Sequence, residues 1–215
     1  MRVEVKVCGL TRASDARAAA ALGARYIGVI FAGGPRSLDP DAAREVLDGG
    51  GATVRRVGVF GKTDARTIAA AVEMAGLDIV QLHADPTSDE VRAVREESGA
   101  HVWAVVRVHG PLDEAGLRDL WRSADALVLD SKVKGVLGGS GIAFDWRDAE
   151  HAAHARAGRL VAAGGLTAAN VGEAIETLAP DVVDVSSGVE TSPGIKDHAR
   201  IADFIEAVRR TGVPG

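Results

Sequence analysis

Short apolar runs alternate with longer amphipathic segments along the whole chain. Eight runs of five to seven residues are rich in valine and isoleucine and have the length of β-strands. The first run alternates between apolar and charged positions, as a strand with two different faces does. The predicted strands are VEVKVC (3–8), YIGVIF (26–31), VRRVGVF (54–60), DIVQLH (78–83), HVWAVVR (101–107), ALVLD (126–130), RLVAAGG (159–165) and VVDVSSG (182–188).

The segments between these runs carry apolar residues at helical spacing. Asp39, followed by a proline, is typical of an N-cap before a first helical residue. Thr87 with Glu90 three residues later fits a capping box, and Thr63 stands where another helix is expected to begin. The predicted helices span 14–24, 40–50, 64–76, 87–99, 113–123, 144–157, 168–180 and 197–210.

Strands that alternate with helices predict parallel pairing and right-handed crossovers. No linker, repeat or shift in composition divides the chain, so we expect one domain over residues 1–215. The expected fold is α/β, a closed (β/α)8 TIM barrel, at the short end of its range of roughly 200 to 400 residues. An open, doubly wound sheet is the alternative that the same alternation allows.

Composition and charge narrow the functional classes. The 215-residue chain has 47% hydrophobic and 26% charged residues, as globular proteins commonly do. Its net charge is −5 and it has no basic block, which argues against sequence-independent binding of DNA or RNA. An anionic ligand must therefore be held by local groups and not by the overall charge.

The numbers and spacing of certain residues argue against disulfides, common metal centres and membrane-targeting segments. The single cysteine excludes an internal disulfide and a multi-cysteine metal centre, and the six histidines show no HExxH spacing. Two histidines in HAAHARAGR (151–159) are expected on a solvated helix face. Charges at positions 2, 4 and 6 and the lack of an apolar run of ~18 residues indicate neither a signal peptide nor a membrane span. We expect a cytoplasmic protein.

In a barrel, the groups that carry chemistry lie at the C-terminal ends of the strands and in the loops that follow. Cys8, His83 and Asp130 occupy such ends on three separate strands. A cysteine there also serves as a small core residue, and a histidine as a hydrogen-bonded group of the rim. The sequence therefore predicts a candidate site at this end of the barrel.

Side-chain parity places further polar groups beneath these ends, because alternate residues of a strand point to opposite faces. Lys6 shares a face with Cys8, and Gln81 shares a face with His83. Asp184 stands on the eighth strand, which neighbours the first in a closed barrel. We therefore expect Lys6 and Asp184 to pair, either as structural groups that satisfy one another or as part of a substrate site.

A thiol and a carboxylic acid at one site suit a reaction that moves protons. A free thiol has a pKa of about 8.5, so Cys8 acts as a base where cationic or dipolar surroundings favour the thiolate. Asp130 is the corresponding acid where low polarity raises its pKa. Hydrolysis suits the pattern less, because no histidine clearly pairs with the thiol.

Glycine-rich loops after the last three strands suggest a phosphate site. The loop 131–141 ends in GGSG, Gly164 and Gly165 close the seventh strand, and Ser187 and Gly188 follow the eighth. Small residues let backbone N–H groups approach an anion, and the loops after strands seven and eight form the usual phosphate site of barrels. A flexible lid is the alternative interpretation of loop 131–141.

An arginine stands apart from these glycine loops. Arg36 lies in GGPRS, the loop after the second strand. A guanidinium there fits a carboxylate through a two-pronged contact, although a solvated loop arginine is the more common case.

Together these residues resemble the phosphoribosylanthranilate isomerase family of tryptophan biosynthesis. The resemblance covers nearly the whole chain, and the cysteine strand is specific, because other phosphate-binding barrels keep the glycine loops but lack it. The matching stretches are KVCGLT (6–11), GVIFAGGPRSL (28–38), VQLH (80–83), VLDSK (128–132), GGSGIAFDW (138–146), AGGLTAANV (163–171) and DVSSGVETSPGIKD (184–197).

The resemblance implies an Amadori rearrangement of N-(5-phosphoribosyl)anthranilate to 1-(2-carboxyphenylamino)-1-deoxyribulose 5-phosphate, with neither cofactor nor metal. Asp130 is then the general acid at the ring oxygen, and Cys8 is the general base at C2 of the ribose. Arg36 holds the anthranilate carboxylate. The remaining implied residues are His83 and Asp184 for the substrate, and Gly139, Ser140, Gly141, Gly164, Gly165, Ser187 and Gly188 for its phosphate.

Two other functions fit parts of the pattern. A dual-use isomerase of the histidine and tryptophan pathways needs paired aspartates on strands one and five, whereas strand one carries Cys8. A non-catalytic phosphosugar-binding barrel has no need of both Cys8 and Asp130. For the assembly we expect a monomer, because no long exposed apolar stripe is apparent in the sequence, with a homodimer as the alternative.

Overall fold

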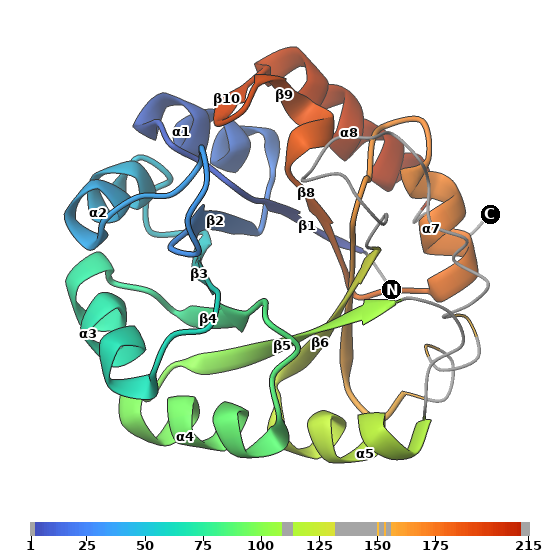
Figure 1. Cartoon of the computed structure of the whole chain (residues 1–215). Helices are drawn as coiled ribbons and strands as arrows, with labels where there is room; N and C mark the ends of the chain where they lie inside the picture. Colours follow the sequence, from blue (N-terminus) through green and yellow to red (C-terminus); the bar gives the residue numbers. More distant parts are fainter. Residues whose placement is uncertain (1–2, 109–113, 132–149, 151–152, 154–155, 212–215) are drawn as a thin grey trace.

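The chain forms a closed barrel of eight parallel strands inside a ring of helices (Figure 1). This computed structural model describes residues 3–108, 114–131, 150, 153 and 156–211. The strands are β1 (Glu4–Val7), β2 (Tyr26–Ile30), β3 (Arg55–Phe60), β4 (Ile79–Leu82), β5 (His101–Val108), β6 (Ala126–Ser131), β7 (Arg159–Ala163) and β8 (Val182–Val185). Because β1 pairs with β8, the predicted closed barrel is confirmed and the open sheet is wrong.

Helices cover the outside of the barrel, and each one described lies near its predicted position (Figure 1). They are α1 (Ala13–Leu22), α2 (Pro40–Asp48), α3 (Ala65–Ala75), α4 (Ser88–Ser98), α5 (Glu114–Ser123), α7 (Val171–Leu178) and α8 (His198–Thr211). Most of the helix expected over 144–157 lies outside the described residues. No described helix is long and apolar enough to cross a membrane.

Side-chain caps fix where several helices begin. Asp39 accepts a hydrogen bond from a backbone N–H in the first turn of α2, and both bonds of the Thr87–Glu90 capping box are present at α4. The expected start at Thr63 is wrong by one residue, because the carboxylate of Asp64 caps α3. These caps satisfy N–H groups that have no partner inside the helix.

The barrel separates two apolar layers. The larger layer lies between the sheet and the helices. The smaller layer fills the inside of the barrel, where Tyr26 and Trp103 meet edge to face with ring centroids 5.1 Å apart. Towards the C-terminal ends of the strands the buried inner positions become polar, at Lys6, Gln81 and Asp184. These polar side chains form the floor of the candidate site.

A short hairpin that the sequence pattern did not predict follows β8. A 3-10 turn, η1 (Ser187–Val189), leads into β9 (Glu190–Ser192), which pairs in antiparallel fashion with β10 (Ile195–Lys196). The hairpin lies beside α1 and leads into α8 (Figure 1). It brings charged side chains to the rim of the barrel, where they take part in the candidate site.

Candidate active site

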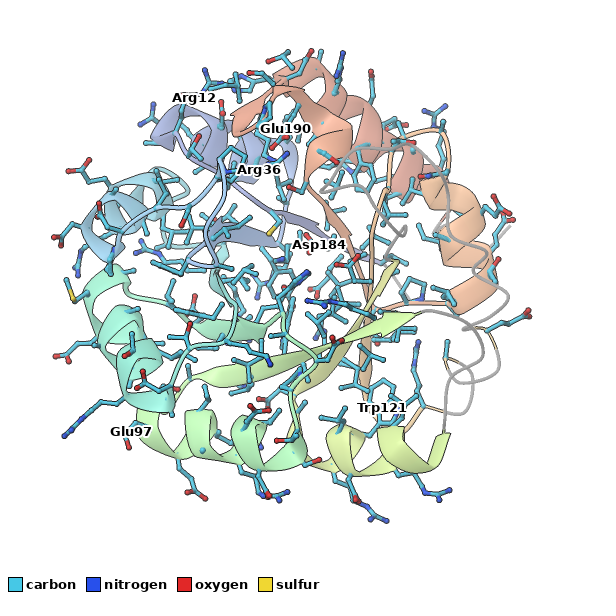
Figure 2. All side chains as sticks on the ribbon, in the orientation of Figure 1. Arg12, Arg36, Glu97, Trp121, Asp184 and Glu190 are labelled. Atoms are coloured by element: carbon cyan, nitrogen blue, oxygen red, sulfur yellow. The ribbon has the colours of Figure 1, made fainter. Side chains whose placement is uncertain are left out.

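The predicted site residues from several strands meet at one end of the barrel. Figure 2 shows Asp184 near the middle of the barrel, with Arg36 and Glu190 together at one side of its mouth. These residues come from β8, the loop after β2 and the start of β9. The barrel therefore gathers charges that are far apart in the sequence.

The only thiol of the chain stands one residue beyond β1. Cys8 is buried, with 6% of its surface exposed. Its backbone N–H donates to the carbonyl of Val185 at 2.8 Å, which ties this position to the end of β8. The chain then turns at Gly9, whose φ of 70° favours glycine. The glycine after the cysteine is thus required by the backbone of the turn.

The expected pair between Lys6 and Asp184 is confirmed. The Nζ of Lys6 donates to Oδ2 of Asp184 at 2.7 Å and to Oε1 of Gln81 at 2.9 Å. Lys6 has no exposed surface, so its charge depends on these two partners. The contacts of Lys6 are those of a structural group, while Asp184 keeps one oxygen for another partner.

Two opposing effects act on the Cys8 thiol. Burial raises its pKa, and the positive charge of Lys6 lowers it. The net pKa of Cys8 is above its usual value. Gly28 on β2 leaves room for this contact, since a Cβ there would lie 3.0 Å from Sγ of Cys8 and 3.2 Å from Cε of Lys6. Lys6 therefore favours a thiolate that burial alone would disfavour.

Asp130 has the properties of a proton donor. It stands near the end of β6, and 22% of its side chain is exposed. Burial raises its pKa to about 6, and the nearby charge of Asp184 acts in the same direction. Lys6 and Arg107 oppose this shift. A carboxyl group with this pKa keeps its proton for part of the time near neutral pH.

His83 lies beside Asp130 at the end of β4. Its Nε2 is 3.4 Å from Oδ2 of Asp130. Burial lowers the pKa of His83, and the charge of Arg107 adds to this effect, so the imidazole is neutral at neutral pH. Arg107 also donates from Nη2 to the backbone carbonyl of His83 at 2.7 Å, which fixes this part of the rim.

Two buried polar atoms at the mouth lack a partner among the described residues. They are Nδ1 of His83 and Oδ1 of Asp184. Buried polar groups are normally hydrogen-bonded, and leaving one without a partner is costly. Both atoms are therefore available to a ligand that carries hydroxyl groups.

Arg36 makes a two-pronged contact, but its partner is a side chain of the protein. Its Nε donates to Oε1 of Glu190 at 2.9 Å, and its Nη2 donates to Oε2 at 2.6 Å. This pairing raises the pKa of Arg36 and helps to lower that of Glu190. The sequence predicted Arg36 as a site residue and missed the carboxylate of Glu190 that holds it.

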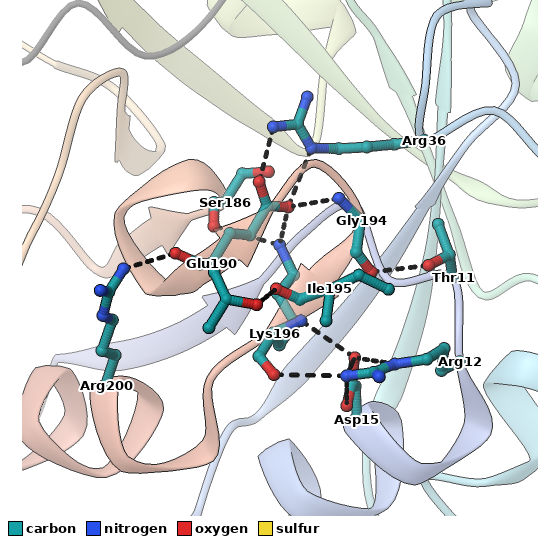
Figure 3. Close-up of polar contacts among 11 residues, drawn as sticks. Thr11, Arg12, Asp15, Arg36, Ser186, Glu190, Gly194, Ile195, Lys196 and Arg200 are labelled. Atoms are coloured by element: carbon teal, nitrogen blue, oxygen red, sulfur yellow. Dashed lines mark hydrogen bonds and ion pairs between the residues drawn. The ribbon is translucent and has the colours of Figure 1, made fainter.

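Lys196 completes this charged cluster (Figure 3). Its buried Nζ donates to Oε1 of Glu190 at 2.8 Å and to the carbonyl of Ser186 at 3.1 Å. The missed signal was SPG, a turn sequence, flanked by glutamate and lysine in GVETSPGIKD. Such a turn brings opposite charges on its two arms together.

The loops after β7 and β8 touch at a glycine. A Cβ on Gly188 would lie 2.0 Å from the carbonyl oxygen of Leu166, so only glycine fits this contact. Gly164 and Gly165 have φ values of 92° and 63°, in the region that favours glycine. The predicted phosphate residues Gly164, Gly165, Ser187 and Gly188 therefore belong to two adjoining loops, while Gly139, Ser140 and Gly141 lie outside the described residues.

We expect Gly188→Ala to raise the KM for a phosphorylated substrate by roughly tenfold, because the two loops must separate to admit the methyl group. Steady-state kinetics and competition by inorganic phosphate measure the effect. Gly61→Ala is the matched control, since a Cβ there would lie 3.5 Å from its nearest neighbour. An unchanged KM in a folded Gly188→Ala variant would contradict a phosphate site at these loops.

The described part of the chain contains no group of three or more histidine, cysteine, aspartate or glutamate side chains that is arranged to hold a metal ion. Both histidines of the predicted helix face at 151–159 lie outside that part.

Comparisons with known proteins agree on one family. The profile of N-(5'phosphoribosyl)anthranilate (PRA) isomerase matches residues 5–207. An enzyme of that name from Acidithiobacillus ferrooxidans is 41% identical over 210 residues, which cover 97% of this chain and 98% of the relative.

Solved structures give the same result. The crystal structure of phosphoribosyl anthranilate isomerase from Thermotoga maritima superposes with a TM-score of 0.86 at 33% identity, covering 97% of this chain and 99% of that one. Another phosphoribosyl anthranilate isomerase structure superposes with a TM-score of 0.82 at 31% identity. The match covers 97% of this chain and 99% of the chain in that structure. That structure is a complex with reduced 1-(o-carboxyphenylamino)-1-deoxyribulose 5-phosphate.

Proposed function

The chain belongs to the N-(5'-phosphoribosyl)anthranilate isomerase family, and on that premise we propose that Cys8 and Asp130 perform the proton transfers of its reaction. The reaction is the Amadori rearrangement of N-(5'-phosphoribosyl)anthranilate in tryptophan biosynthesis. It needs an acid at the ring oxygen of the ribose, a base at C2 and a means of holding two anionic ends. The chain offers a group for each of these tasks.

Asp130 performs the first step. Its protonated carboxyl donates to the ring oxygen as the bond from that oxygen to C1 breaks, which leaves an iminium between C1 and the aniline nitrogen. Burial favours the protonated form, because a charged carboxylate is poorly solvated there. The raised pKa of Asp130 thus supplies the acid that ring opening requires.

Cys8 performs the second step. Its thiolate removes the proton from C2, and the electron pair of the C–H bond neutralises the iminium to give an enolamine. The hydroxyl group on C2 of the enolamine then loses its proton, and C1 gains one. This tautomerisation yields the ketone at C2 without net oxidation or reduction. Lys6 supports the thiolate during this step by its charge.

The other groups hold the substrate. Oδ1 of Asp184 and Nδ1 of His83 are suited to the ribose hydroxyls, because neither atom has a described partner in the protein. Arg36 faces the aryl carboxylate. The phosphate binds at the adjoining loops of Gly164, Gly165, Ser187 and Gly188, together with Gly139, Ser140 and Gly141.

One observation carries this assignment. The charges of Lys6 and Asp184, which are bonded to each other, act on both Cys8 and Asp130, so the thiol and the carboxyl border the same buried pair. A phosphosugar-binding protein needs no such acid and base. Purified protein is therefore expected to consume phosphoribosylanthranilate, measured by the loss of substrate fluorescence; binding without that loss would contradict the proposal.

Replacing Lys6 by methionine is expected to raise the pKa of the Cys8 thiol further, because burial remains and the positive charge that opposes it most is lost. The ultraviolet absorbance of the thiolate during a pH titration measures this shift, and the single cysteine makes the signal unambiguous. Arg12→Met, which removes a half-exposed cation paired with Asp15, is the control. An unchanged titration in folded Lys6→Met would show that Lys6 does not support the thiolate.

We further propose that the protein works in the cytoplasm, as a monomer or a homodimer. A thiol that acts as a base must stay reduced, which a reducing compartment ensures. Among the described residues, Met74 is the one large apolar side chain that is exposed, which favours a monomer. A structure from Thermotoga maritima is described as monomers derived from a dimeric isomerase, so the dimer is the alternative. Cell fractionation and sedimentation velocity test the two points.

A further inference from the structure

The guanidinium of Arg36 has two edges, and the protein occupies one of them. An arginine offers an edge-on pair of donors at Nε and Nη2 and an end-on pair at Nη1 and Nη2. Glu190 takes the edge-on pair, with distances of 2.9 and 2.6 Å. Figure 3 shows the remaining nitrogen of Arg36 turned away from Glu190. The end-on pair therefore stays available for a second carboxylate.

Glu190 is itself held in place on both of its sides. Its side chain is 4% exposed, and Oε1 accepts hydrogen bonds from Nζ of Lys196 at 2.8 Å and from the backbone N–H of Gly194 at 3.2 Å. These donors belong to the β9–β10 hairpin, on the far side of the carboxylate from Arg36 (Figure 3). Glu190 is thus a fixed support and not a mobile surface group.

The stem of Arg36 passes close to the thiol. A Cβ on Gly9 would lie 2.8 Å from Cδ of Arg36, so the arginine crosses the turn that follows Cys8. The charge of Cys8 also contributes to the raised pKa of Arg36. The side chain of Arg36 therefore lies close to the group that acts at C2 of the ribose in the proposed mechanism.

Arg36, Glu190 and Lys196 form a cluster with two positive charges and one negative charge, in which Glu190 and Lys196 are buried and Arg36 is partly exposed. Its neighbour, Asp15 with Arg12, is a balanced pair. An excess positive charge at low exposure favours an anionic ligand, since the charge is poorly solvated without one.

We propose that Glu190 and Lys196 position Arg36, so that the end-on edge of its guanidinium selects substrates that carry a carboxylate beside the aniline nitrogen. This inference rests on the proposed function and adds Glu190 as a positioning residue that determines specificity. It predicts that Glu190 matters for a substrate with the carboxylate and matters little for the same molecule without it.

The test compares two ligands: the reduced product analogue, and the same compound with phenyl in place of carboxyphenyl. Glu190→Gln keeps the shape of the side chain but presents an N–H group to Arg36. We expect the dissociation constant of the carboxylated analogue to rise at least about tenfold, and that of the phenyl analogue to change less than about threefold. Calorimetry on the purified variants measures both constants.

Asp15→Asn is the matched control. Asp15 has no exposed surface and accepts hydrogen bonds from Arg12 and from the backbone N–H of Lys196, but it does not touch Arg36. It is expected to lose stability and to keep the preference of the wild type for the carboxylated analogue. Glu190→Asp, which withdraws the carboxylate by one methylene, is the second variant and is expected to lose part of that preference.

The outcomes separate the inference from the proposed function. Equal weakening of both ligands by Glu190→Gln or Glu190→Asp, or no weakening at all, would overturn the positioning role. Wild-type protein that binds neither analogue would instead contradict the proposed function. Loss of the preference in Asp15→Asn as well would show that the whole hairpin, and not Glu190, is responsible, and would also overturn the inference.

Discussion

Replacing Cys8 by alanine is expected to lower kcat by at least about a hundredfold and to leave the affinity for the reduced product analogue nearly unchanged. The thiolate is the base at C2 in our mechanism. Of the groups whose charges act on Cys8, Lys6 and Lys196 are cations, and Asp184 is held in its ion pair with Lys6. The methyl group of alanine fills part of the buried space that the thiol occupies. Steady-state kinetics together with calorimetry separate turnover from binding.

Cys8→Ser makes this prediction sharper. Serine keeps the size and polarity of the group, but its hydroxyl is far less acidic than a thiol, so it supplies no base. The serine variant should therefore lose about as much activity as the alanine variant, on the order of a hundredfold or more. Near-normal turnover in either variant, with thermal unfolding like that of the wild type, would remove Cys8 from the mechanism.

Replacing Asp130 by asparagine is also expected to lower kcat at least about a hundredfold, because an amide donates no proton to the ring oxygen. Binding of the product analogue should change little. The stability of the fold should move in the opposite direction from activity, and this makes the variant informative: a loss of turnover in a protein that is more stable than the wild type is not a folding defect.

The gain in stability follows from the pKa of Asp130. Folding raises this pKa from 3.8 to about 6, so the folded state holds the proton more tightly than the unfolded chain. The ionised carboxylate therefore costs stability above pH 6, and this cost fades as the pH falls towards 3.8. The amide in the Asp130→Asn variant is neutral at every pH, so this variant should have a free energy of unfolding at neutral pH that is higher by on the order of 2 kcal/mol.

The pH dependence of kcat/KM reports the same two groups. Below a pH of about 6 the rate should rise with pH, because Asp130 stays protonated while the thiolate fraction grows. Above a pH of about 6, the fraction of Cys8 in the thiolate form still increases, but the protonated fraction of Asp130 falls in proportion. The value of kcat/KM therefore becomes constant. It falls only when Cys8 is itself ionised, at a pH above the usual range of a thiol.

The substrate phosphate also titrates in this pH range, and it does so equally for the wild type and for the Asp130→Asn variant. A comparison of their pH profiles therefore separates the ionisation of Asp130 from that of the phosphate. If Asp130 is the acid, the residual rate of the variant should keep rising with pH until the thiol ionises. The same levelling near pH 6 in the wild type and the variant would assign it to another group.

The fold was predictable because the strand signals are long, apolar and regularly spaced. Each run of valine and isoleucine is buried on both faces in the barrel, so nothing in the tertiary structure competes with its local preference. The β9–β10 hairpin was missed because its arms are only three and two residues long, too short to show alternation.

Some contacts of the candidate site follow from strand geometry, and others depend on how the loops fold. Lys6 and Asp184 were paired correctly, because side-chain parity and barrel closure are properties of the backbone. The contact between Arg36 and Glu190 joins residues 154 positions apart, and it depends on how a loop and a hairpin fold onto the rim. No periodic pattern records such a contact, so sequence reasoning found the arginine and missed its partner.

The central claim is that a thiolate from β1 and a carboxylic acid from β6 act on the same sugar. A crystal structure with the reduced product analogue bound tests it most directly. Our account predicts Sγ of Cys8 against C2 of the sugar, the carboxyl of Asp130 within hydrogen-bond distance of the oxygen on C4, and the aryl carboxylate on Arg36. A sugar whose C2 lies out of reach of the sulfur, or whose C4 oxygen faces away from Asp130, would contradict it.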